Sequence, residues 1–143
     1  MEIRDRVKEL RRVPASELLA NPKNIQHHDE EQRDAMSAVL AEIGFAGACL
    51  ARETDEGQLL LINGHLRQDI LGDQVVPVLV TDLTEREADA LLAVFDPIGR
   101  MARIDPEKHK ALAAEIEAQE AGLRKLLIEM IADAEKHLKT AAN

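Results

Sequence analysis

Aromatic residues are almost missing from this chain of 143 residues, which has no Trp, no Tyr and two Phe. Its core must therefore be aliphatic, and the aromatic platforms on which proteins stack single-stranded nucleic acid are excluded. Cysteine is equally scarce, because Cys49 is the only one. An intramolecular disulfide is thus impossible, and a reducing compartment such as the cytoplasm is expected.

Long apolar runs and an excess of positive charge are also absent. No run is long enough to span a bilayer, and the charged N-terminus does not resemble a signal peptide. The net charge of −9 disfavours steering onto DNA or an anionic membrane. A local basic patch stays open, because positive and negative charges balance in the first thirty residues, which contain Lys8, Arg11, Arg12 and Lys23.

The pattern of apolar and turn residues predicts a mixture of strands and helices. The predicted elements are a strand over 9–13, a helix over 30–43, strands over 48–52 and 58–62, a helix over 65–71, a strand over 75–81 and a helix from 84 to about 95. Asp29 is positioned to cap the first long helix. Thr84 and Glu87 form a capping box, and Asp96-Pro97 is expected to end the last of these helices.

The last forty residues are rich in Ala, Glu, Lys and Leu and carry an apolar stripe at helical spacing. Gly122 predicts a break between two helices. They form either a helical hairpin packed on the domain or a dimer or partner interface. We therefore expect an α+β fold, a small mixed β-sheet flanked by helices over 1–104, with a C-terminal helical extension over 105–143.

Four segments in a fixed order resemble the N-terminal domain of ParB-like proteins, in the ParB/sulfiredoxin superfamily. They are Leu18–Asn24, with its Asn-Pro turn, Ile43–Phe45, Leu60–Arg67 and Val76–Val80. The variant is more similar to the ParB-like domains found beside phage and mobile-element DNA modification proteins than to the chromosome-partition proteins. The resemblance implies a nucleotide- or DNA-associated protein. A homodimer is expected through the C-terminal helices.

The segment Ile62-Asn63-Gly64-His65-Leu66-Arg67 resembles the strand and G-E-R-R box of this family. A glycine there allows close approach of a ligand, and an arginine one turn later offers a fork of donors to phosphate. The resemblance implies binding of a nucleoside triphosphate, CTP or ATP with Mg. The predicted phosphate-binding residues are Asn63, Gly64, His65, Arg67, Asn24, His28 and Arg100.

Two other chemistries are disfavoured by the residues present. His65 stands where sulfiredoxins carry a catalytic cysteine, so sulfinic acid reduction is not expected. Cys49 is interpreted as a small buried hydrophobe. The adjacent His27 and His28 point apart in an extended loop, and no metal site is predicted.

Three functions stay open from the sequence, and whether the chain is an enzyme is undecided. The first is a ParB-like domain that binds a phosphate-bearing ligand at the Gly64–Arg67 turn. The second is a catalytically eroded module that dimerises or docks a partner protein through its C-terminal helices. The third is a metal-dependent nuclease that uses Asp69, Asp96 and His65.

Overall fold

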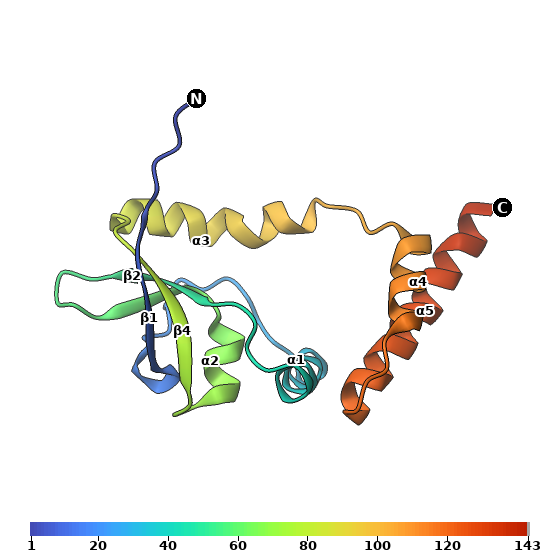
Figure 1. The fold of residues 1–143 in the computed structure, drawn as a ribbon. Coiled ribbons are helices and arrows are strands. Elements are labelled where there is room, and N and C mark those ends of the chain that lie inside the picture. The colour runs from blue at the N-terminus through green and yellow to red at the C-terminus, as the bar shows by residue number, and fades with distance from the viewer. Residues whose placement is uncertain (143) are drawn as a thin grey trace. The chain divides into compact units, whose positions relative to one another are not determined.

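The chain folds into two compact units in a computed structural model that describes residues 1–142. The first unit comprises residues 1–28 and 45–99, and the second comprises residues 29–44 and 100–142. The elements are β1 (Val7–Pro14), the 3-10 helix η1 (Ala15–Glu17), α1 (Glu30–Glu42), β2 (Cys49–Glu53), β3 (Leu59–Asn63), α2 (His65–Leu71), β4 (Val75–Thr81), α3 (Glu85–Arg100), α4 (Pro106–Glu115) and α5 (Ala121–Ala142) (Figure 1). Helix α1 groups with the C-terminal helices, whereas the sequence places it with the sheet. The domain boundary between residues 104 and 105 stays a prediction.

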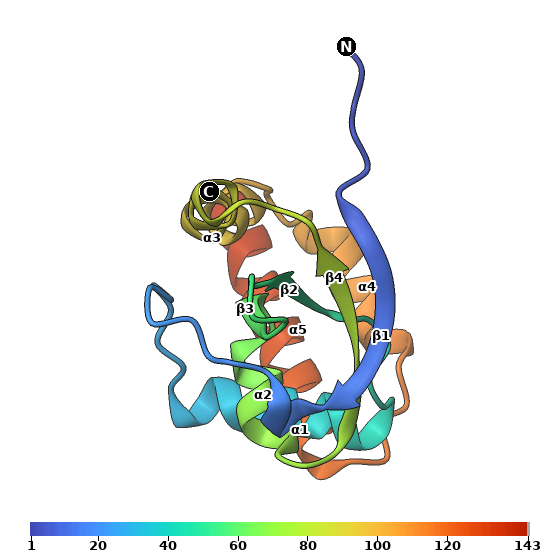
Figure 2. The same cartoon turned by 90° about the vertical axis from the view of Figure 1, so that its left-hand side faces the viewer.

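The first unit is built on a four-stranded sheet in the order β1-β4-β2-β3. Strands β1 and β4 are antiparallel and lie side by side in Figure 2, β4 and β2 are parallel, and β2 and β3 form an antiparallel hairpin. The combination confirms the predicted small mixed sheet in an α+β fold. Because β4 is central and apolar, its residues Val76, Val78 and Val80 are buried.

The core of this unit is aliphatic, as the composition requires. Its buried cluster consists of Ala15, Leu18, Cys49, Ala51, Leu59, Leu61, Val76, Val78 and Val80. Val13, Phe45 and Leu71 pack against the cluster while remaining partly exposed. Helix α2 is tied to η1 because the Gln68 side-chain amide donates to the carbonyl oxygens of Ala15 and Leu18.

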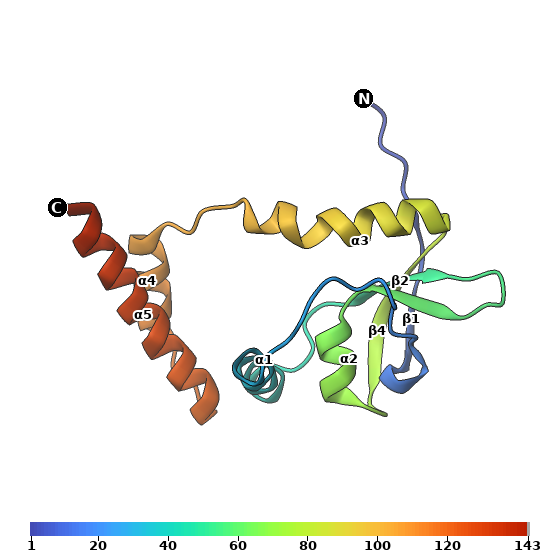
Figure 3. The ribbon, with the colours of Figure 1, turned by 180° about the vertical axis from the view of Figure 1, so that it is seen from behind.

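Helix α3 follows β4 in the chain and begins with the predicted capping box (Figure 3). The Glu87 N–H donates to the Thr84 hydroxyl, and the Thr84 N–H donates to the Glu87 carboxylate. The predicted end at Asp96-Pro97 is wrong, since α3 includes Pro97 and continues to Arg100. A proline inside a helix removes one hydrogen bond and crowds the carbonyl of residue i−4, but the N–H groups after it can still form helical bonds, so one further turn follows.

The Glu87 carboxylate also receives the Arg6 guanidinium, with the closer N···O distance at 2.6 Å. The Arg6 hydrogen bond, with the capping bonds from Thr84, lowers the pKa of Glu87 to about 2. A carboxylate whose pKa is lower in the folded state stabilises the fold above its unfolded pKa, and loses this contribution as pH falls toward the folded pKa.

We therefore expect Glu87→Gln to be less stable than the wild type at pH 6, with the difference shrinking between pH 5 and pH 2. Urea unfolding at a series of pH values measures it, and a constant difference would contradict the ion pair.

The second unit contains α1 and the helical hairpin of α4 and α5. Asp29 caps α1 as predicted, because its carboxylate accepts from the Gln32 N–H. The predicted break between two helices is confirmed, but it lies over residues 116–120, and Gly122 itself lies in the first turn of α5. Its role is close packing, since a Cβ there would come within 2.9 Å of the Ala38 Cβ. Within residues 1–142, no helix is both long and apolar enough to cross a membrane.

Candidate functional site

Arg67 lies in the first turn of α2, and two neutral groups hold its guanidinium. Its Nη2 donates to the Asn63 side-chain oxygen at 2.9 Å, and its central carbon lies 4.9 Å from the centre of the Phe45 ring. Asn63 ends β3, so the i to i+4 spacing brings the two side chains together across the Gly64 turn. In the part of the chain that the structure describes, Arg67 has no carboxylate partner. Its charge is thus positioned but not neutralised.

Phe45 and Gly47 complete the surroundings of Arg67, and the sequence prediction missed both. They belong to the segment between α1 and β2, and a Cβ at Gly47 would lie 3.7 Å from Arg67 Nη1. A ring face under a guanidinium contributes a cation–π attraction and fixes the plane of the fork. The available signal was that Phe45 is one of only two phenylalanines in the chain.

Gly64 has a packing role that the sequence did not indicate. Its φ of 112° lies in the left-handed region, and a Cβ there would meet Cys49, at 2.6 Å from Sγ and 3.3 Å from Cα. Only glycine therefore lets the turn sit directly on β2. Cys49 itself is fully buried, and burial raises the pKa of its thiol, as expected for a structural hydrophobe.

His65 braces the neighbouring loop. Its Nε2 accepts a hydrogen bond from the Asn21 backbone N–H at 3.1 Å. Burial lowers the pKa of His65, the nearby His28 lowers it further, and Asp96 opposes the shift. The neutral imidazole that this favours is the form that can accept the bond. Whether His65 also contacts a ligand stays a prediction.

The loop that begins with the Asn21-Pro22 turn is held in place by Asn21, which is buried. Its side-chain amide donates to the Leu61 carbonyl at 3.1 Å, and its side-chain oxygen accepts from the Lys23 N–H. Asn24 makes a similar local turn, because its side-chain oxygen accepts from the Gln26 N–H. The loop therefore contacts the box through Asn21, which the sequence analysis did not name as a site residue.

Helix α3 brings carboxylates to the same loop. Lys23 forms an ion pair with Asp89 at 2.7 Å, and the Gln26 side chain donates to Asp96. The predicted site residue Arg100 is the last residue of α3 and belongs to the second unit. Its role as a phosphate ligand stays a prediction.

Comparisons with known proteins bear on the fold. No protein-family profile and no curated protein sequence matches the chain. Among solved structures, the C-terminally truncated chromosome-partitioning protein ParB from Caulobacter crescentus, complexed with CTP-gamma-S, superposes with a TM-score of 0.63 at 20% identity. The chain has a ParB-like fold. That superposition covers 74% of this chain and 61% of the ParB chain, so this chain spans less than two thirds of that neighbour.

A second ParB-like structure gives a longer but looser match. The Pnob8-like ParB-N domain superposes with a TM-score of 0.50 at 19% identity, covering 94% of this chain and 48% of that chain. The ParB-like fold predicted from four short motifs is thereby confirmed. The similarity to phage and mobile-element variants stays a prediction.

Proposed function

We propose that this ParB-like domain binds a nucleotide through its triphosphate at the Gly64–Arg67 turn. One observation carries the proposal: the Arg67 guanidinium is half-buried, is held by Asn63 and Phe45, and has no carboxylate partner within the described residues. A guanidinium has five N–H donors, and the Asn63 bond uses one of them. A phosphate is the anion whose oxygens match such a fork.

The ligand solved with a structural neighbour supports a nucleotide. The Caulobacter ParB that superposes on this chain was crystallised with CTP-gamma-S. We extend this to CTP or ATP for the present chain, with Arg67 as the main phosphate-binding residue. Asn24 and His28, in the loop that His65 and Asn21 brace, are proposed to contact the remainder of the nucleotide.

Local charges favour a small phosphate ligand over duplex DNA. A basic patch near the N-terminus would depend on four cationic side chains, and three of them form ion pairs with carboxylates. Lys8 and Arg11 pair with Glu53, and Lys23 pairs with Asp89. DNA affinity depends on several phosphates neutralised together. A single preorganised guanidinium suits one triphosphate better than a duplex, so DNA is the less favoured ligand.

Magnesium would enter this site with the nucleotide. Residues 1–142 contain no group of three metal-ligating side chains, so a cage made entirely by the protein is not supported. Mg²⁺ commonly takes most of its ligands from phosphate oxygens and water, and then needs one or two carboxylates. Asp96, whose carboxylate accepts a hydrogen bond from the Gln26 side chain of this loop, is the residue we propose for this role.

A nucleotide panel tests the proposal in a thermal-shift experiment. With CTP or ATP and Mg at a hundred times the Kd, mass action adds about 2.7 kcal/mol to stability and raises the Tm by several degrees. Inorganic phosphate should raise it less, and a 20-base-pair duplex should leave it unchanged. An unchanged Tm with every nucleotide at millimolar concentration would refute nucleotide binding.

The interaction module is the second candidate, and one observation favours it. Large apolar side chains on the C-terminal hairpin stay exposed, including Leu112, Ile116 and Ile128. Exposed apolar residues of this kind suit a protein interface. A homodimer through these helices stays a prediction. A metal-dependent nuclease is not proposed, because residues 1–142 contain no group of three metal-ligating side chains.

A further inference from the structure

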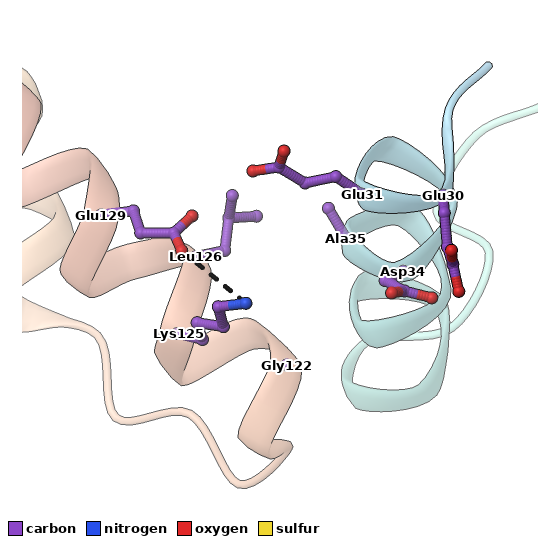
Figure 4. A pocket seen from close by; sticks show the side chains of 8 residues that line it. All are labelled: Glu30, Glu31, Asp34, Ala35, Gly122, Lys125, Leu126 and Glu129. Atoms are coloured by element: carbon purple, nitrogen blue, oxygen red, sulfur yellow. Dashed lines mark ion pairs between the residues drawn. The ribbon is translucent and has the colours of Figure 1, made fainter.

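A groove of about 750 Å³ lies between α1 and α5, entirely within the second unit (Figure 4). It is lined by Glu30, Glu31, Asp34, Ala35, Gly122, Lys125, Leu126 and Glu129. Its volume falls in the range of clefts that accommodate several side chains of a ligand. Neither the nucleotide site nor the exposed face of the hairpin uses it.

The geometry of the groove is fixed at one end. The Glu42 carboxylate accepts from the backbone N–H groups of Gln119 and Glu120, at 2.7 Å each, just before α5 begins. Close by, Gly122 packs against Ala38 so tightly that no side chain fits between them. Gly122 also lines the groove, which therefore begins next to this contact and lies between α1 and α5.

The floor of the groove is apolar. Figure 4 shows the side chains of Ala35 and Leu126 pointing toward one another from the two helices. Gly122 adds a surface without any side chain. This floor can therefore make van der Waals contacts with a small apolar side chain of a ligand, whereas it offers no polar side chain to a hydrated ion.

The rim of the groove is strongly acidic. It has four carboxylates, and its single cation, Lys125, lies 4.0 Å from the Glu129 carboxylate. The three α1 carboxylates, Glu30, Glu31 and Asp34, have no cationic partner within residues 1–142. Three negative charges around an apolar floor are complementary to a basic, amphipathic ligand.

We propose that this groove docks a basic amphipathic helix of a partner protein. An apolar residue of that helix would rest on Ala35 and Leu126, and Lys or Arg residues one turn away would pair with Glu31 and Asp34. A second copy of this chain is a poor occupant, since each copy carries a net charge of −9 and would present the same carboxylates. Nucleic acid and anionic membranes are repelled for the same reason.

Fluorescence anisotropy of the full chain with a labelled helical peptide tests this inference. The probe is an Ala-based 15-residue peptide with Leu at its centre and Lys one turn on either side, and the matched control has Glu in place of Lys. Glu31→Gln with Asp34→Asn should weaken binding of the Lys peptide about tenfold, because each exposed ion pair contributes modestly. Glu115→Gln with Glu117→Gln makes the same change in net charge outside the groove and should leave the affinity unchanged.

A steric variant separates docking from simple charge attraction. Ala35→Leu fills the floor without changing any charge and should weaken the Lys peptide at least as much, while circular dichroism confirms that the helices persist. Equal effects of the two double variants would overturn the proposal. An unchanged affinity of Ala35→Leu for the Lys peptide would also overturn the proposal, because the carboxylates would then attract the peptide by charge alone. None of these variants touches the nucleotide site, so failure here leaves the proposed function standing.

Discussion

Gly64→Ala is expected to lower the free energy of unfolding by about 2–5 kcal/mol. An alanine at a φ of 112° has a strained backbone, which costs about 1–2 kcal/mol. The new Cβ would also lie 2.6 Å from the Cys49 Sγ and 3.3 Å from its Cα. Because Cys49 is fully buried in the core, neither group can move away freely, and overpacking adds about 1–3 kcal/mol.

Gly57→Ala is the matched control for this prediction. Gly57 also has a positive φ, of 80°, in the β2–β3 turn, but a Cβ there would meet no atom within 4 Å. It should therefore show the backbone cost alone, about 1 kcal/mol. Urea denaturation of both variants measures the difference. Equal losses would show that Gly64 is required only for its backbone conformation, and not for packing on Cys49.

Arg67→Ala is expected to weaken nucleotide binding by roughly ten- to a hundredfold. Hydrogen bonds to a charged group contribute about 1.5–3 kcal/mol, and this side chain supplies the fork that the proposal assigns to phosphate. Arg67→Lys keeps the charge but loses the fork and the plane stacked on Phe45, so it should recover only part of the affinity. A titration followed by calorimetry gives both dissociation constants.

Arg12→Ala controls for the change in net charge. Arg12 is an exposed residue of β1, outside the turn and its loop, and its removal alters the charge by the same amount. Its affinity for nucleotide should equal that of the wild type. If Arg12→Ala and Arg67→Ala weaken binding equally, the effect is general electrostatics and Arg67 has no specific role.

Local signals in the sequence were sufficient for most of the elements. The Asp29 cap, the Thr84–Glu87 capping box and the glycine-bounded helix over 65–71 all depend on bonds between near neighbours in the chain, and the structure confirms them. The same is true of the hairpin of β2 and β3, whose turn residues lie between two apolar runs.

Contacts between residues that are far apart in the chain could not be predicted from such local signals. In the sequence, Gly122 indicates a helix break. In the structure, a glycine is needed there because the helix packs closely on Ala38, more than eighty positions earlier in the chain. The stacking of Arg67 on Phe45 likewise depends on how the segment before β2 folds back. Sequence reasoning found Arg67 and Asn63 of the candidate site through a motif, but it could not find Phe45, whose ring lies under the guanidinium.

The most direct test of the account is a calorimetric titration of the wild-type chain with CTP and with ATP in the presence of Mg, repeated with Arg67→Ala. The account predicts saturable binding of at least one nucleotide by the wild type, and a dissociation constant raised at least tenfold in the variant. Saturable binding that Arg67→Ala leaves unchanged would contradict it, because the phosphate would then be held elsewhere in the chain.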